Sequence, residues 1–365
     1  MITSYDKRLS LSPVRGESVI DASKVWFPIR LSIENRYYLN EVTIYLIKTP
    51  RGFALIDAGL NTEMAFSSLK KGLNSLGLDV SDIRSIYLTH YHLDHSGLCR
   101  RILKSASVYI FMSMNERYTL DFMNNHVDLY PEMLEEFFKT YGVPVYIIEH
   151  IKKQILFYKN LLRCPDEDNV LSIEELEEIE LEHGYLKVIP TPGHTPGHTS
   201  FYYPEERVLF GGDFVMRDEW PHVGVYPHNP PEYNPLKDYL VSIQKIENLN
   251  IEMILPSHGD FILKPKERLF EIKNFISYKI RSILELFKEK KIVSIMEISE
   301  HIFKIYKFRL SLKYFFVLTL SLAYLRYLEG EGFIKSEKTD SGIRYVVVQK
   351  LSPLKRSPKL HNSIS

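Results

Sequence analysis

Four side chains that commonly bind metal ions lie within six residues of this sequence: His90, His92, Asp94 and His95. Imidazole and carboxylate groups are ligands that Zn²⁺ takes in catalytic sites. In an extended segment, His90 and His92 point the same way, because side chains on one face repeat every two residues. If the chain then turns into a helix, Asp94 and His95 can face a second metal position. The segment therefore predicts a metal-binding cluster.

Further Asp and His residues occur where other short apolar segments end. Asp57 follows one such segment, and His194 lies in a loop rich in Pro and Gly. Asp213 and His258 each follow another. A lone Asp or His at a strand end is more often a turn residue or a cap. The five motifs together, in this order, indicate one catalytic metal site.

On these five motifs, the chain resembles the metallo-β-lactamase superfamily over about residues 40–260. The resemblance implies an α+β fold, a four-layer αββα sandwich with the site at the edge where strand ends converge. It also implies two metal ions that share a bridging carboxylate. The ligands of the first would be His90, His92 and His194, and those of the second Asp94, His95 and His258, with Asp213 as the bridge. Asp57 matches the motif's carboxylate that orients ligands without binding a metal itself.

The ligand types favour two Zn²⁺ ions. Iron or manganese are alternatives, because both accept imidazole and carboxylate. Two metals about 3.5–4 Å apart lower the pKa of a shared water toward about 7 and supply hydroxide at neutral pH. The resemblance thus implies a hydrolase that uses a metal-bridging hydroxide. Asp94 is the catalytic candidate for orienting this hydroxide or collecting its proton.

Three further histidines near these motifs each have two interpretations. His198, four residues beyond His194, either supports a ligand or substrate or only shapes the turn. His222 and His228, with Tyr226 between them, either donate a proton to a leaving group or are ordinary loop residues.

Apolar periodicity predicts the elements that must position these residues. Alternating apolar residues predict a β-hairpin over 40–57, and helical spacing predicts a helix over 61–76. Short apolar runs predict strands at 83–89, 107–111, 180–190, 201–203, 207–210 and 253–255. This alternation indicates sheets covered by helices.

Two regions depart from this alternation. Residues 113–180 are polar and predict a helical insertion that covers the site, with helices at 131–141, 145–162 and 172–178. The last part predicts helices at 269–287, 294–306 and 311–328, then strands at 333–335 and 344–348. We therefore expect a catalytic domain over 1–263, a winged-helix domain over 264–350, and a flexible tail over 351–365.

The formal net charge is zero, from 46 Lys plus Arg and 46 Asp plus Glu, but the charge is unevenly distributed. From Lys264 onward there are 21 basic and 10 acidic residues, which leaves 25 basic and 36 acidic residues before it. This shift supports a domain boundary there. The basic segment either attracts an anionic partner or is a solvated surface.

The cysteine content and the apolar runs bear on the compartment. The two cysteines, Cys99 and Cys164, cannot form a disulfide framework and suit a reducing cytoplasm. The N-terminus lacks the apolar core of a signal peptide. The apolar run 314–325 is shorter than the roughly 20 residues a membrane span needs. We expect a cytoplasmic protein with no membrane partner.

A closer resemblance concerns a subgroup that carries a C-terminal winged helix. It rests on the run Pro235-Leu236-Lys237-Asp238-Tyr239-Leu240-Val241-Ser242 and on residues 325–334, similar to the subgroup's third helix end and wing start. The subgroup includes an endoribonuclease and proteins similar to glyoxalase II.

These members suggest two substrate classes. We expect a small-molecule ester, thioester or lactone substrate, with single-stranded RNA as the alternative, bound through Lys and Arg contacts to phosphate. The third C-terminal helix is apolar nearly all round, whereas a groove-reading helix should carry Arg, Lys, Asn or Gln. This favours packing against the catalytic domain or a homodimer through the C-terminal domain. A scaffold or DNA-binding protein is disfavoured by the complete ligand set.

Overall fold

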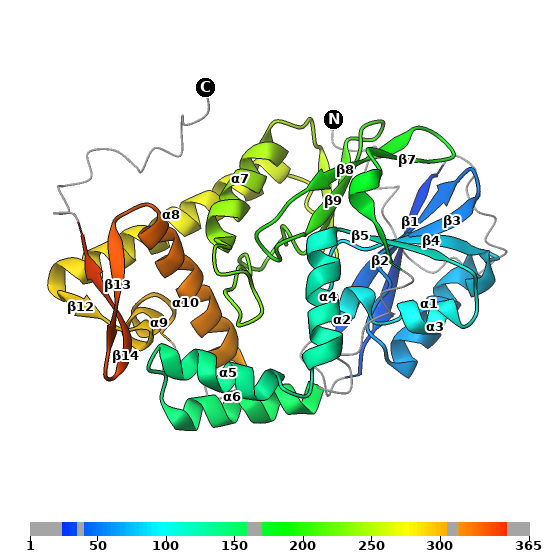
Figure 1. Cartoon of the computed structure of the whole chain (residues 1–365). Helices are drawn as coiled ribbons and strands as arrows, with labels where there is room; N and C mark the ends of the chain where they lie inside the picture. The colour runs from blue at the N-terminus through cyan, green and yellow to red at the C-terminus, as the bar shows by residue number, and fades with distance from the viewer. Residues whose placement is uncertain (1–23, 35–39, 159–169, 305–311, 349–365) are drawn as a thin grey trace.

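The computed structural model describes residues 24–34, 40–158, 170–304 and 312–348. Within them, two β-sheets face each other, helices cover their outer faces, and a small third sheet lies among the C-terminal helices (Figure 1). This is a mixed α+β fold, as the sequence predicts. The expected tail over 351–365 lies outside the described residues.

The first sheet has six strands that lie in chain order. They are β1 (Trp26–Ser32), β2 (Glu41–Thr49), β3 (Gly52–Ile56), β4 (Ile83–Tyr87), β5 (Tyr109–Met112) and β6 (Val170–Ser172). The antiparallel pair β2–β3 is the predicted hairpin, and strands β3 to β6 are mutually parallel. Strand β1, which contains Pro28, was not predicted from the sequence. An edge strand tolerates proline, since its N–H side need not be paired.

The second sheet has five strands in the order β11-β10-β9-β8-β7. They are β7 (Glu178–Glu180), β8 (Tyr185–Pro190), β9 (Thr199–Tyr203), β10 (Val208–Gly212) and β11 (Met253–Pro256). Strands β8 and β10 both run antiparallel to β9, and β11 runs parallel to β10. The carboxyl ends of β8, β10 and β11 therefore meet at one edge of this sheet.

Alternation along the strands builds the two cores. On β2, Ile44 and Leu46 join the apolar cluster of the predicted helix α1 (Glu63–Ser75), which contains Leu69. Tyr45, one position along, faces the second sheet, where its ring meets that of Phe210 at 5.1 Å. The inter-sheet core brings the ends of β3 and β4 opposite those of β8, β10 and β11.

The described residues of the segment 113–180 include three α-helices: α4 (Met114–His126), α5 (Tyr130–Thr140) and α6 (Val145–Tyr158). Helix α5 and the described part of α6 agree with the prediction from the sequence, whereas α4 was not predicted as a separate helix. The helix predicted at 172–178 is wrong. Those residues form the end of β6, a 3₁₀ turn at Ile173–Glu175 and the start of β7, because pairing with β5 and β8 outweighs local helical preference.

The C-terminal part contains α8 (Pro265–Glu289), β12 (Ile292–Val293), α9 (Ile295–Phe303), α10 (Lys313–Gly330), β13 (Ile334–Thr339) and β14 (Gly342–Val347). The three helices and the hairpin agree with the sequence prediction, except that residues 305–311 lie outside the described part. The two-residue β12 was missed, and it completes a sheet of order β12-β14-β13. Helix α10 packs against α7 (Pro235–Glu247), α9 and α6.

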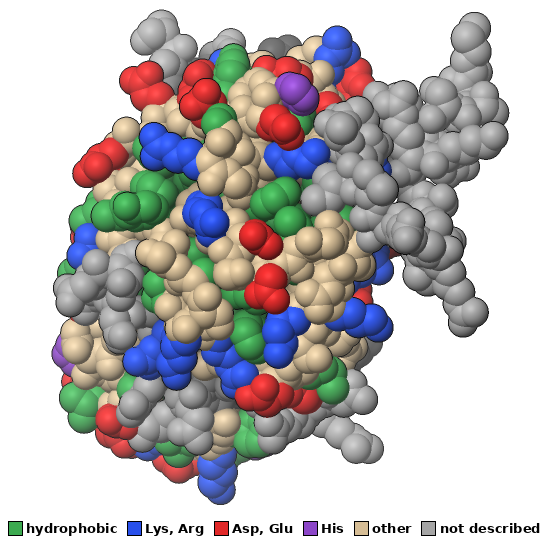
Figure 2. All heavy atoms as spheres, turned by 90° about the vertical axis from the view of Figure 1, so that its right-hand side faces the viewer, with side chains coloured by type: hydrophobic (Ala, Val, Ile, Leu, Met, Phe, Trp, Pro, Cys, Tyr) green, Lys and Arg blue, Asp and Glu red, His purple; other side chains and the backbone are tan. Residues whose placement is uncertain are grey.

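The described surface is mixed in character. Figure 2, which views the side of the first sheet, shows Lys, Arg, Asp and Glu side chains interspersed with scattered apolar ones. Among the described helices, none has the length and apolarity that a membrane span requires.

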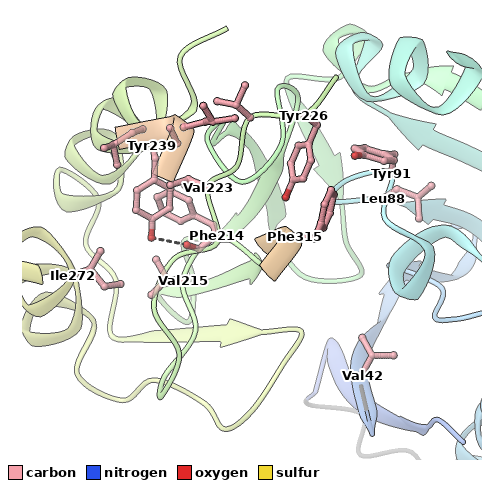
Figure 3. Packing of buried hydrophobic residues seen from close by; sticks show 14 of the residues in the cluster. Val42, Leu88, Tyr91, Phe214, Val215, Val223, Tyr226, Tyr239, Ile272 and Phe315 are labelled. Carbon is pink, nitrogen blue, oxygen red and sulfur yellow. Dashed lines mark hydrogen bonds between the residues drawn. The ribbon is translucent and has the colours of Figure 1, made fainter. Parts of the chain in front are cut away.

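Tyr239 of α7 links this helix to the site edge. Its ring is fully buried, and its hydroxyl donates to the Phe214 carbonyl oxygen at 2.8 Å (Figure 3). A side chain at position 193 would place its Cβ 2.5 Å from the Cβ of Tyr239, and the φ of +138° at Gly193 also requires glycine. The loop that carries His194 is thus pressed onto α7.

Tyr239→Phe should lower the free energy of unfolding by about 1–2 kcal/mol, because the buried Phe214 carbonyl loses its donor. Urea unfolding followed by circular dichroism measures this. Tyr278→Phe, at an exposed position on α8, is the control and should change stability little. Equal stability of the two variants would contradict the assigned role.

Candidate metal centre

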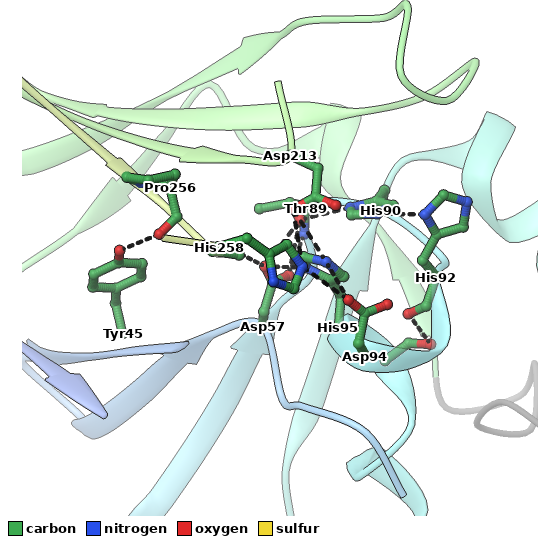
Figure 4. A network of polar contacts seen from close by, with 12 residues as sticks. Tyr45, Asp57, Thr89, His90, His92, Asp94, His95, Asp213, Pro256 and His258 are labelled. Carbon is green, nitrogen blue, oxygen red and sulfur yellow. Dashed lines mark hydrogen bonds and ion pairs between the residues drawn. The ribbon is translucent and has the colours of Figure 1, made fainter. Parts of the chain in front are cut away.

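Three imidazoles converge at the edge where the strands end. His90 and His92 follow β4, and His194 follows β8 (Figure 4 shows the first two). His92 Nδ1 lies 2.9 Å from His90 Nε2 and 3.1 Å from His194 Nε2. Ligand nitrogens around one tetrahedral Zn²⁺ are separated by about 3.3 Å, given Zn–N bonds of about 2.0–2.1 Å. The spacing therefore fits three ligands of one small cation.

A second group lies beside the first. Asp94 and His95 stand on the short helix α2 (Leu93–Ser96), as the sequence predicted, and His258 follows β11. Asp94 Oδ2 is 2.9 Å from His258 Nε2 and 3.4 Å from His95 Nε2. The ligand atoms of this group, together with Asp213, lie within 4.8 Å of one another.

Asp213 lies between the two groups at the end of β10. Its Oδ2 is 3.6 Å from His194 Nε2, and its Oδ1 is 3.4 Å from His95 Nε2 and 3.5 Å from His258 Nε2. One carboxylate oxygen thus faces each group. This is the position that the resemblance assigned to a bridging ligand.

Charge distinguishes the two groups. Burial, followed by the neighbouring imidazoles, holds the pKa of His90 well below its usual value, so that its ring is neutral. Burial also lowers the pKa of His258, but the charges of Asp213 and Asp94 outweigh it and raise that pKa to about 9. A neutral imidazole can bind a cation directly. The second group, which contains Asp94 and Asp213, requires either bound protons or a metal to balance its negative charge.

Hydrogen bonds to the other ring nitrogens orient the ligands. His95 Nδ1 donates to Asp57 Oδ2 at 2.8 Å, and His194 Nδ1 donates to the His222 carbonyl oxygen at 2.8 Å. His90 Nδ1 lies 2.9 Å from the Thr89 hydroxyl, which is itself 3.0 Å from Asp57. These contacts leave the Nε2 atoms to face the metal positions. Asp57 thus lies where the resemblance places the carboxylate that orients ligands.

His198 supports the site without reaching the ligand groups. It is fully buried, its Nε2 accepts the backbone N–H of Asp213 at 3.3 Å, and its Nδ1 lies 2.9 Å from the Thr191 hydroxyl. Its carbonyl oxygen accepts the backbone N–H of Thr191. His198 thus bonds the Asp213 backbone and closes the loop, contacts that are compatible with either interpretation.

The remaining two histidines lie in the loop after β10. His222 Nε2 lies 2.9 Å from the Tyr226 hydroxyl. The ring nitrogens of His228 lie 3.1 Å from the Tyr91 hydroxyl and 3.2 Å from the Tyr130 hydroxyl of α5. Sequence reasoning could not have paired His228 with Tyr91, which is 137 residues away.

A metal fits these residues on grounds of unsatisfied polar atoms as well as donor type. His95 Nε2 and Asp213 Oδ1 are buried, and neither has a hydrogen-bond partner within the described part of the chain. Buried polar atoms usually have hydrogen-bond partners, so an imidazole nitrogen and a carboxylate oxygen that face each other at 3.4 Å without a hydrogen bond fit a site for a cation. The structure thus gathers all seven predicted ligands, from the segments that follow β4, β8, β10 and β11 and from helix α2.

One residue that contacts the site loops was missed. Glu116 on α4 is fully buried and accepts backbone N–H groups from Tyr91 and Gly197. The pattern Ser113-x-x-Glu116 is a capping-box signature and could have drawn attention to it. Its carboxylate bonds the two loops instead of its own helix cap.

Comparisons with known proteins find relatives over most of the chain. A family model described as the metallo-beta-lactamase superfamily matches residues 37–258. A beta-lactamase-like protein 2 homolog of Caenorhabditis elegans is 27% identical over 270 residues, 73% of this chain and 72% of that protein. The probable metallo-hydrolase YqjP of Bacillus subtilis is 25% identical over 317 residues, 84% of this chain and 94% of that protein.

A solved structure extends the similarity beyond the family model. The metallo-beta-lactamase family protein TTHA1429 from Thermus thermophilus superposes with a TM-score of 0.74 and 27% identity. The match covers 88% of this chain and 98% of that protein. It therefore includes more of the chain than residues 37–258.

His228 makes stability depend on pH. Burial lowers the pKa of His228 to about 4 in the folded protein, whereas in the unfolded chain this pKa returns to about 6.5. As the pH falls below that value, the unfolded state binds a proton that the folded state does not, so stability falls. Between about pH 7 and pH 5, the free energy of unfolding should fall by about 2 kcal/mol more in the wild type than in His228→Gln.

Urea unfolding of both proteins in the same metal-saturated buffer measures the difference. The exposed His301→Gln variant is the control and should keep the pH dependence of the wild type. The explanation fails if His228→Gln and wild type lose stability in parallel on acidification.

Proposed function

Because this chain belongs to the metallo-beta-lactamase superfamily and is a metal-dependent hydrolase, we propose that it binds two metal ions and cleaves a small ester, thioester or lactone. The observation that carries the dinuclear site is the position of Asp213, with one carboxylate oxygen toward each histidine group. Two Zn²⁺ ions suit the ligand types best, and iron or manganese remain alternatives.

The residues divide the work of holding the metals and the substrate. The first ion would take His90, His92 and His194, the second Asp94, His95 and His258, with Asp213 shared. When bound, such ions supply hydroxide at neutral pH and polarise the oxygen of the scissile group. Asp57, through the hydrogen bond to His95, keeps one ligand in its orientation.

Substrate access follows from exposure. His90 and His95 are fully buried, whereas His92, Asp94 and His258 each retain some exposed surface. The substrate therefore approaches past this second set. Asp94 Oδ2 faces His95 and His258, and its partial exposure makes Asp94 the candidate for orienting the attacking oxygen or taking its proton.

Helix α10 supports a small substrate rather than a nucleic acid. The ring of Phe316, partly buried, meets that of His222 edge-on at 4.7 Å, and His222 in turn holds His194. The backbone N–H of Val225 donates to the Thr319 carbonyl oxygen of α10 at 3.1 Å. The apolar face of α10 thus packs on the site loop, which is one of the two alternatives predicted for it.

The C-terminal part carries two finer proposals. Three helices and the sheet β12-β14-β13 have the order of a winged helix, and we assign that name on this arrangement. The exposed rings of Phe270 and Tyr278 on α8 support a homodimer through this part.

Single-stranded RNA remains the alternative substrate, supported by the excess of basic over acidic residues from Lys264 onward.

The purified protein should contain about two metal ions per chain, and His92→Ala should lose hydrolysis while keeping the fold. Elemental analysis, circular dichroism and an ester assay measure these properties. His183→Ala, at an exposed position outside the ligand groups, is the control and should retain both metal and activity. A fully active, metal-free protein would contradict the proposed function.

Parallel assays with ester, thioester, lactone, phosphodiester and single-stranded RNA substrates should find turnover of one of the first three classes. Phe316→Ala should lower kcat/KM for that substrate about tenfold, which corresponds to about 1.4 kcal/mol of lost contact. Tyr109→Ala is the matched aromatic control, because Tyr109 is exposed and begins β5 at the opposite edge of the sheet. RNA cleavage without ester, thioester or lactone turnover would favour the alternative.

A further inference from the structure

Two loops supply the first metal group, and one buried carboxylate, that of Glu116, accepts a backbone N–H from each. Loop 89–95 carries His90 and His92, and loop 191–198 carries His194. Glu116 Oε2 accepts the backbone N–H of Tyr91 at 2.8 Å, and its Oε1 accepts that of Gly197 at 2.6 Å. Tyr91 stands between two of the predicted ligands.

Glu116 reaches both loops because α4 begins against them. The helix is capped by Ser113, whose hydroxyl accepts the backbone N–H of Glu116. A Cβ at Gly197 would lie 2.1 Å from Ser113 Oγ and 2.9 Å from Glu116 Cγ. Only glycine permits this approach. The loop, the cap and the carboxylate are therefore built as one contact.

The burial of this carboxylate requires an explanation. Glu116 is fully buried, and among the described residues no Lys or Arg side chain forms an ion pair with it. Burial raises its pKa to about 7, although the Tyr91 and Gly197 N–H groups act in the opposite direction. Burying an unpaired charge is costly, and a helix cap alone does not need it, since Ser113 already serves as the cap.

We propose that Glu116 is a positioning residue, whose two carboxylate oxygens hold loops 89–95 and 191–198 at the separation that lets His90, His92 and His194 share one metal ion. Glu116 does not bind the metal itself. A second link, from the N–H of Thr199 at the start of β9 to the Thr89 carbonyl oxygen at 2.9 Å, joins the end of loop 191–198 to the residue before His90. Glu116 is the corresponding link beside Tyr91.

This inference rests on the proposed metal site, so its test reads metal affinity as well as activity. Glu116→Gln keeps the size of the side chain but turns an amide NH₂ toward one of the two backbone N–H donors. That N–H then loses its hydrogen bond, because an NH₂ group cannot accept. Partners that orient metal ligands typically change affinity about 10–100-fold when removed. We expect the first Zn²⁺ to bind Glu116→Gln at least about tenfold more weakly, by chelator competition.

Glu174→Gln is the matched control. The Glu174 carboxylate also accepts a backbone N–H in the first turn of α4, that of Met114 at 3.0 Å, but it is exposed and touches neither loop. It should bind metal as the wild type does. The visible spectrum of Co²⁺-loaded protein provides a second readout and should change for Glu116→Gln only.

The outcomes separate the two proposals. Wild-type metal affinity and Co²⁺ spectrum in a folded Glu116→Gln variant would overturn the positioning role, as would equal weakening in Glu174→Gln. If wild type itself binds no metal, the proposed function fails instead. Should Glu116→Gln not fold, Glu116→Asp tests the same point, because it keeps the charge but cannot reach both donors; unchanged affinity there also overturns the proposal.

Discussion

The arrangement around Asp213 is the constraint on which the rest of the structure depends. This carboxylate is almost completely buried and has an imidazole group on either side, at 3.6 Å from His194 and 3.4 Å from His95. Such a cluster persists only if its charges are balanced and its members cannot move apart. The two sheets keep the members of the cluster together, because their packing through Tyr45 and Phe210 fixes the end of β10 opposite the ends of β3 and β4.

The ligands are oriented mostly by groups that have no chemical function of their own. The His222 carbonyl oxygen directs His194, the Thr89 hydroxyl directs His90, and Asp57 directs His95. These groups are in turn held by other elements, since Phe316 of α10 packs on His222. The helical insertion and the C-terminal helices are therefore coupled to the metal centre, although neither provides a metal ligand.

Prediction from the sequence succeeded where a signal was local. The histidine cluster, the strand-end carboxylates and the long amphipathic helices each show their pattern within about 20 residues. It failed where pairing with distant chain decided the outcome. Residues 172–178 became two strand ends and a turn because β5 and β8 were available as partners, and β1 formed despite Pro28 because it lies at an edge.

The sequence by itself determined the chemistry of this protein: which side chains can bind metals, in what order they occur, and that strands end beside them. Those properties follow from residue type and short-range spacing. Only the tertiary structure decided how the ligands are arranged around each metal position and that Asp213 faces both groups. It also decided that Glu116 bonds two ligand loops, through Gly197, which is 81 residues away in the chain, and Tyr91, which is 25 residues away. Such contacts depend on how sheets and helices pack, and packing leaves no local signature in the chain.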